Sequence, residues 1–243
     1  MEAKNRIILP LDVSDTGRAK EIVAELVPHV GTFKVGLELI TAIGAPAAVA
    51  LVHEAGGKVM LDGKFCDIPN TVAGATRAAS ALSVDMLTVH ASCGQESVKA
   101  AVDTCGRSKI VGVTVLTSID NDECIEIFGD KPSVKVQQFA RMLVDVGAHA
   151  VVCSPQEVES LAQLPLIRIT PGVRPAWASI GDQRRTMTPY DAMLAGADYL
   201  VIGRPITQPP SHIGSPAEAA RAVATEVTAA LLTKAARDIT RDR

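Results

Sequence analysis

The chain has 243 residues, of which 47% are hydrophobic and 21% are charged, and its formal net charge is −3. This length and composition are typical of a globular protein with one large or two small domains. The slightly negative charge and the lack of a basic tract argue against a protein that binds nucleic acid through a general positive surface.

Short β-rich runs alternate with longer helix-like stretches along the chain. Eight runs predict strands, at 6–13, 32–36, 58–62, 86–90, 109–116, 150–154, 166–172 and 199–203. The stretches between and after them predict helices at 14–29, 45–55, 70–83, 95–105, 134–146, 189–195 and 216–235. Several of these helices begin with a capping residue or proline and end in glycine.

Eight strands, each followed by a helix, is the count of a TIM (β/α)8 barrel. A doubly wound open sheet is the alternative, but it usually has fewer strands and a Gly-rich first turn, whereas the first turn here reads DVSDTG. No linker, low-complexity segment or charge block divides the sequence, so we predict a single-domain barrel over residues 1–243. Two long loops, 117–133 and 173–189, are expected to act as lids on its catalytic face.

The sequence also predicts a cytoplasmic protein. Its N-terminal apolar run is too short for a signal peptide, and no stretch is long and apolar enough to span a bilayer. The five cysteines are odd in number and lack a CxxC pair, which indicates reduced, buried thiols rather than disulfides or a zinc site.

Polar residues stand at the carboxyl ends of the predicted strands. In chain order they are Asp12, Lys34, Asp62 with Lys64, His90, Thr117, Ser154, Arg174 and Gly203 with Arg204. Because the active site of a TIM barrel forms at this rim, we expect these residues to line one site. Asp62 and Lys64 are two positions apart, so an extended backbone would direct both side chains to the same face.

The stretch DGKFCDIPNT, from Asp62 to Thr71, has the densest charge. With the upstream residues it predicts an alternating row, Asp12, Lys34, Asp62, Lys64 and Asp67, in which opposite charges keep one another ionised. A protonated lysine fixed beside a reacting carbon can stabilise carbanion character and then donate a proton. Each feature alone also fits a solvated salt-bridge cluster, a snorkelling lysine or a helix cap, but their convergence on one rim favours catalysis.

A second group of residues predicts an anion site. Arg174 and Arg204 follow strands seven and eight, where TIM barrels commonly bind phosphate with the help of backbone N–H groups. Gln183 lies in the second long loop and is placed to close over the ligand. Taken singly, the two arginines also fit ordinary surface residues beside a turn glycine.

Several segments together resemble the orotidine 5′-phosphate decarboxylase family, in order and with matching spacing over essentially the whole chain. They are LDV, FKVG, DGKFCDIPNT, VTVLTS, TPGVRPAWASIGDQRR and VIGRPI. The resemblance implies a TIM-barrel homodimer that needs no cofactor or metal and converts orotidine 5′-phosphate to UMP and carbon dioxide. This reaction is the last step of de novo UMP synthesis.

The resemblance also implies catalytic roles. Lys64 would protonate C6 of the pyrimidine, Asp62 would lie near the substrate carboxylate, and Lys34 would complete the charge network. Asp67 and Thr71 would reach into the site of the neighbouring subunit.

Further positions match the substrate-binding residues of the family. Asp12 and Lys34 would contact the ribose hydroxyls, and Thr117 would contact the substrate after strand five, a role that Ser118 could share. Arg174, Gln183, Gly203 and Arg204 match the phosphate and lid positions.

Two other functions stay open. A phosphosugar decarboxylase or aldolase of the same superfamily shares DxKxxD but stabilises an enediolate with Mg²⁺, and it would need another carboxylate where Lys34 stands. A non-catalytic barrel would bind UMP without turnover.

Overall fold

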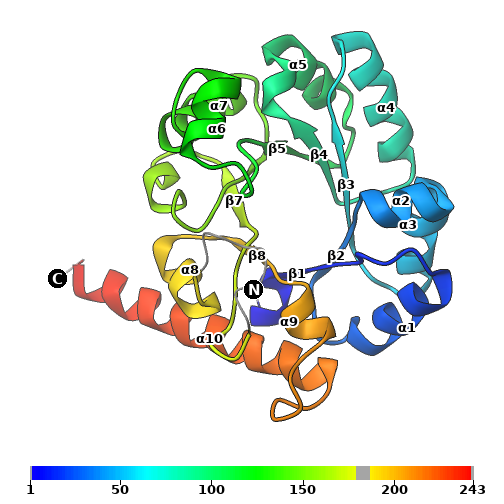
Figure 1. Cartoon of the computed structure of the whole chain (residues 1–243), viewed down its shortest axis with the longest axis vertical. Helices are drawn as coiled ribbons and strands as arrows, with labels where there is room; N and C mark the ends of the chain where they lie inside the picture. The colour runs from blue at the N-terminus through cyan, green and yellow to red at the C-terminus, as the bar shows by residue number, and fades with distance from the viewer. Residues whose placement is uncertain (1, 179–186, 242–243) are drawn as a thin grey trace.

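Eight parallel strands form a closed barrel in the computed structural model, which describes residues 2–178 and 187–241 (Figure 1). The strands are β1 (Ile7–Pro10), β2 (Thr32–Val35), β3 (Val59–Phe65), β4 (Met86–His90), β5 (Lys109–Val113), β6 (Ala150–Val152), β7 (Ile167–Thr170) and β8 (Tyr199–Val201). Each strand pairs with the next one in sequence, and β8 returns to β1, where Leu200 pairs with Ile7. The predicted TIM barrel is confirmed, and the open sheet is excluded.

Helices form the outer ring around this barrel (Figure 1). They are α1 (Thr16–Leu26), α2 (Leu37–Ile43), α3 (Ala45–Glu54), α4 (Pro69–Ala81), α5 (Gln95–Thr104), α6 (Asn121–Phe128), α7 (Pro132–Asp145), α8 (Pro189–Ala195), α9 (Arg204–Thr207) and α10 (Pro216–Arg241). Short 3-10 helices lie at η1 (Ala3–Arg6), η2 (Ala91–Cys93) and η3 (Glu159–Leu161). Helix α1 begins later than predicted because Asp15 caps it, accepting a hydrogen bond from the Arg18 N–H at 2.7 Å.

The helices differ from the prediction at three places. The sequence pattern predicts neither α2 nor α6, and α6 occupies the middle of the segment 117–133 that we expected to be an open loop. Asp120 caps α6, and Gly129 ends it in the left-handed conformation, at φ 81°. Between β6 and β7, a segment described in full, only η3 is present; no helix was predicted at these residues, but the count of one helix after each strand is wrong here.

Most strands end earlier than predicted, but β3 ends later. Strand β1 stops at Pro10, which leaves Asp12 in the following loop, and β5 stops at Val113. Strand β3 continues to Phe65, so Asp62 and Lys64 lie within the sheet rather than at its end. The residues that leave the strands early build the loops over the carboxyl end of the barrel.

Two hydrophobic clusters fill the structure. The first lies inside the barrel and consists of Ile8, Met60, Met86, Val111, Ala150 and Ile169. The second, much larger cluster lies between strands and helices. Gly112 of β5 allows one such contact, because a Cβ at this position would collide with Leu143 of α7. The apolar interior of the barrel forms a floor for the polar groups at its carboxyl end.

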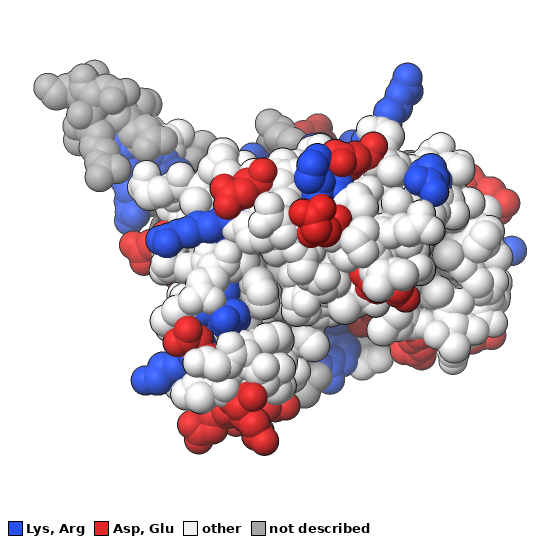
Figure 2. All heavy atoms as spheres, turned by 90° about the horizontal axis from the view of Figure 1, so that it is seen from above, with Lys and Arg blue, Asp and Glu red and all other residues white. Residues whose placement is uncertain are grey.

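The cysteines, the surface charges and the helix lengths can be compared with the predictions made from the sequence. All five cysteines are described and are free thiols; Cys105, Cys124 and Cys153 are buried, but Cys66 is exposed and Cys93 is half-buried, so the prediction of buried thiols is wrong for Cys66. Figure 2 shows a face on which basic side chains lie among acidic ones. In the described ranges, no single helix is long and apolar enough to cross a membrane; only α2 and α3 together reach that length, with a 105° bend between them.

Candidate active site

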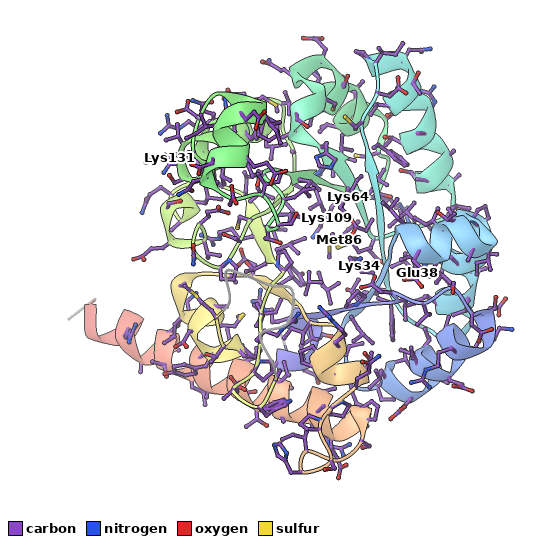
Figure 3. The ribbon with its side chains drawn as sticks, in the orientation of Figure 1. Lys34, Glu38, Lys64, Met86, Lys109 and Lys131 are labelled. Atoms are coloured by element: carbon purple, nitrogen blue, oxygen red, sulfur yellow. The ribbon has the colours of Figure 1, made fainter. Side chains whose placement is uncertain are left out.

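Four charged side chains meet at the carboxyl end of β1, β2 and β3. The ammonium nitrogen of Lys64 lies 2.7 Å from Oδ2 of Asp62, and that of Lys34 lies 3.1 Å from the same oxygen. Lys34 also lies 3.5 Å from Oδ1 of Asp12. Figure 3 shows Lys34 and Lys64 together near the centre of the ring of strands. The structure therefore brings these four residues together in the order that the sequence predicts.

Gly36 makes room for this arrangement. It precedes α2, and a Cβ built at this position would lie 2.9 Å from the ammonium nitrogen of Lys34 and 3.4 Å from Oδ1 of Asp12. The chain therefore turns away from β2 without displacing the lysine from the two carboxylates.

Asp62 is the centre of the charge network, and its side chain is only 8% exposed. Burial would raise the pKa of Asp62, but the ammonium groups of Lys34 and Lys64 and their hydrogen bonds outweigh that effect and hold the pKa below its ordinary value. Asp62 is therefore a carboxylate at neutral pH, shared by two cations.

Asp62→Asn is expected to lower the free energy of unfolding at pH 7 by roughly 3 kcal/mol, because two partly buried ammonium groups lose their common, buried counter-ion. The folded-state pKa lies below the unfolded value of about 4, so the carboxylate contributes fully above that pH and its contribution is lost as pH falls through the folded value. Urea unfolding of both proteins from pH 7 to pH 3 tests this. If the difference in free energy of unfolding between wild type and Asp62→Asn already shrank between pH 7 and pH 5, the pKa of Asp62 would be raised rather than lowered.

The backbone at Lys64 departs from the extended conformation that we expected. The pairing of β3 with β4 shifts register between Leu61 and Phe65, and Lys64 has a φ of 47°, in the left-handed region. The backbone N–H of Lys64 donates to Oγ1 of Thr88 at 2.9 Å, and the Thr88 hydroxyl donates to Oδ1 of Asp62 at 3.0 Å. Asp62 and Lys64 share a face as predicted, but a bulge rather than a regular strand brings them together.

A pocket of about 190 Å³ lies beside this network. Lys34, Asp62, Lys64 and Thr117 supply its polar groups, and most of the remaining wall is apolar, formed by Met60, Val113, Val115, Leu116, Val152, Cys153, Pro171 and Val201. Ser118 lines an adjoining pocket of about 400 Å³ instead, which Thr117 also borders. Of the two candidates after β5, Thr117 is therefore the one that borders the charged pocket.

The predicted anion-binding arginines share a second pocket, of about 420 Å³. Arg174 and Arg204 line it together with Trp177, Ala178, Pro205, Gln208 and Pro210. The backbone N–H of Arg174 donates to the Met187 carbonyl at 2.9 Å, and this bond joins the two ends of the second long loop. Gly203 precedes Arg204 and α9, and a Cβ there would lie 2.8 Å from Pro10. Gln183 lies outside the described residues.

Asp67 and Thr71 stay outside the charge network of their own chain, so the predicted charge row is wrong at its last member, Asp67. Both are exposed, and the Asp67 carboxylate accepts a hydrogen bond from the Ile68 N–H at 2.6 Å. Within residues 2–178 and 187–241, Asp67 forms no ion pair with Lys34 or Lys64. Ile68, between them, is 66% exposed, which is unusual for a large apolar side chain.

Two residues of β4 complete the surroundings of Lys64. Thr88 is fully buried and is missing from the residues that the sequence suggests for the site. His90, at the end of the strand, is half-buried, and burial followed by the nearby charge of Lys64 lowers its pKa. The alternation of Met86, Thr88 and His90 in MLTVH places all three on one face of the strand and is the signal that could have identified Thr88.

The described residues contain no group of three or more His, Cys, Asp or Glu side chains that could hold a metal ion. The position where a magnesium enzyme would need another carboxylate carries Lys34, whose ammonium group points at Asp62.

A family model and several known proteins match most of this chain. The model of the family described as "Orotidine 5′-phosphate decarboxylase / HUMPS family" matches residues 5–223. An orotidine 5′-phosphate decarboxylase of Moorella thermoacetica is 45% identical over 241 residues, which cover 93% of this chain and 94% of the relative. Another, of Anaeromyxobacter sp., is 45% identical and covers 92% and 99%. The crystal structure of an orotidine 5′-phosphate decarboxylase from Lactobacillus acidophilus superposes with a TM-score of 0.77 at 31% identity, covering 91% of this chain and 98% of that one.

Proposed function

The chain belongs to the orotidine 5′-phosphate decarboxylase / HUMPS family, and from this premise we propose that it converts orotidine 5′-phosphate to UMP and carbon dioxide. The observation that carries the proposal is the row of Asp12, Lys34, Asp62 and Lys64 beside a small, largely apolar pocket. Fixed charges of this kind stabilise charge that develops during a reaction.

Lys64 supplies the central chemistry in this proposal. When the bond between C6 and the carboxylate breaks, its electron pair stays on C6, a vinylic carbon from which the ring cannot delocalise it as in a simple enolate. The Lys64 ammonium stabilises this pair and then transfers a proton to C6, after which solvent reprotonates the lysine. Asp62, 2.7 Å from the ammonium nitrogen, holds it in place, and the proposal puts the leaving carboxylate near Asp62.

The other residues hold the substrate. Asp12 and Lys34 contact the ribose, and Thr117 contacts the pyrimidine from the wall of the charged pocket. Arg174, Gln183, Gly203 and Arg204 bind the phosphate, and the pocket shared by the two arginines supports this assignment. Binding energy from the phosphate, remote from C6, serves to order the reacting groups.

We further propose a homodimer in which Asp67 and Thr71 complete the site of the neighbouring subunit. Both residues are exposed, lie outside their own charge network and flank the exposed Ile68, as expected of an interface. In this proposal the protein is a single barrel domain that works in the cytoplasm, needs no cofactor and carries out the last step of de novo UMP synthesis.

The purified protein is expected to decarboxylate orotidine 5′-phosphate equally fast with and without EDTA, because the charges at C6 come from side chains. The measurement is the ultraviolet absorbance of the substrate after addition of protein. Turnover that EDTA abolishes would favour the Mg²⁺-dependent phosphosugar reaction class, and tight UMP binding without turnover would favour a non-catalytic barrel.

A further inference from the structure

Thr88 connects the two residues on which the proposed chemistry depends. Its side chain is fully buried in β4, next to the bulge of β3. The Lys64 N–H can only donate, and the Asp62 carboxylate can only accept. The Thr88 oxygen therefore accepts from Lys64 at 2.9 Å and gives its single proton to Oδ1 of Asp62 at 3.0 Å.

The first of these bonds holds the strained backbone of Lys64. Left-handed φ values are unfavourable for residues other than glycine and persist only where the surroundings fix them. At the shift in register between Leu61 and Phe65, the ordinary ladder is interrupted. The Thr88 hydroxyl receives the N–H there, so a side chain rather than a strand carbonyl fixes the direction in which the Lys64 side chain leaves β3.

The second bond fixes the rotation of the Asp62 carboxylate. With Oδ1 held by Thr88, Oδ2 faces the ammonium groups of Lys64, at 2.7 Å, and Lys34, at 3.1 Å. Rotation of the carboxylate would break three contacts at once. Because Thr88 is 0% exposed, water does not replace its hydroxyl without repacking of the strand.

We propose that Thr88 is a positioning residue for the decarboxylation, acting through the backbone of Lys64 and the carboxylate of Asp62. The inference rests on the proposed function of this site. A proton donor displaced by a fraction of an ångström loses much of its effect on the transition state, while substrate binding through the phosphate and ribose is little affected.

The test is Thr88→Val, which keeps the shape of the side chain and removes both hydrogen bonds. We expect kcat to fall about ten- to a hundredfold while KM changes less than about threefold. In a plot of kcat against pH, the acid limb should move to higher pH, because Asp62 loses the hydrogen bond from the Thr88 hydroxyl that favours its ionised form. Thr88→Ser keeps the hydroxyl and should restore kcat to within about threefold of wild type.

Thr76→Val is the matched control. Thr76 is also fully buried, but its hydroxyl has no hydrogen-bond partner in the part of the chain that the structure describes, so its loss should leave kcat unchanged. Wild-type kcat in Thr88→Val, or an equal loss in Thr88→Val and Thr88→Ser, would overturn the inference. If Thr88→Val does not fold, Thr88→Cys must show the same fall in kcat relative to Thr88→Ser, because the two variants lack the same methyl group and differ in the thiol, a much weaker donor and acceptor than the hydroxyl.

Failure of the proposed function would look different. Wild-type protein would then leave orotidine 5′-phosphate unchanged, before any variant is compared. A carbon-13 NMR titration of the Asp62 carboxyl group tests the role of Thr88 without turnover. The pKa of Asp62 should rise in Thr88→Val and should return to the wild-type value in Thr88→Ser. An unchanged pKa in Thr88→Val would overturn the positioning role.

Discussion

Lys64→Ala is expected to reduce kcat for decarboxylation of orotidine 5′-phosphate by at least about 10⁴-fold, because one substitution removes both the positive charge beside C6 and the proton donor. The variant should still bind UMP, since the arginine pocket and Thr117 are unchanged. Single-turnover rates at saturating substrate measure the chemical step, and titration with UMP measures binding separately.

Lys20→Ala is the control for this substitution. Lys20 lies exposed on α1, so its loss should change neither kcat nor UMP affinity. If Lys64→Ala retained more than about a hundredth of wild-type kcat, Lys64 would not be the proton donor, and another group would have to supply both the charge and the proton at C6.

The charge row could be predicted because it depends on strand order alone. Parallel strands that are neighbours in sequence end at the same rim, so Asp12, Lys34 and Asp62 had to lie close together once the barrel was inferred. The bulge at Lys64 could not be predicted, because DGKF reads as an ordinary strand end and a left-handed lysine has no sequence signal. Thr88 shares a strand face with His90 and could have been suspected from that alternation, but its hydrogen bond to the backbone of Lys64 depends on the bulge.

In the fold, too, features that follow from sequence patterns could be predicted, and features that depend on local contacts could not. Buried strands of Val, Ile and Leu are readable from short apolar runs, which is why all eight were located. Helix α2 has seven residues and α6 has eight, too few for a clear helical period, and neither begins with the proline that marks the equally short α8. Their existence depends on packing and on caps such as Asp120, so the segment around α6 looked like an open loop.

The position of Asp67 suggests a role for the exposed surface around Ile68. The side chain lies five residues from Asp62, yet it points out of its own network and bonds the adjacent Ile68 N–H. The proposed second subunit would explain together the exposed apolar side chain of Ile68 and the two polar residues that find no role in their own site. A shared site of this kind can be tested by mixing two inactive proteins.

Asp67→Ala alone is expected to lower kcat at least about a hundredfold, because the neighbouring site loses a charge. Mixing Lys64→Ala with Asp67→Ala should then restore about a quarter of wild-type activity after subunit exchange. Random exchange makes half of the dimers mixed, and each mixed dimer has one site with an intact Lys64 from one chain and an intact Asp67 from the other.

Lys64→Ala mixed with Asp62→Asn is the control, because these two residues belong to the same site and no mixed dimer contains an intact one. Native mass spectrometry establishes that mixed dimers have formed in both experiments. Recovery only in the first mixture identifies Asp67 as a residue that crosses the interface. If mixed dimers form and activity stays at background in both, Asp67 acts within its own chain, and the exposed face around Ile68 requires a different explanation.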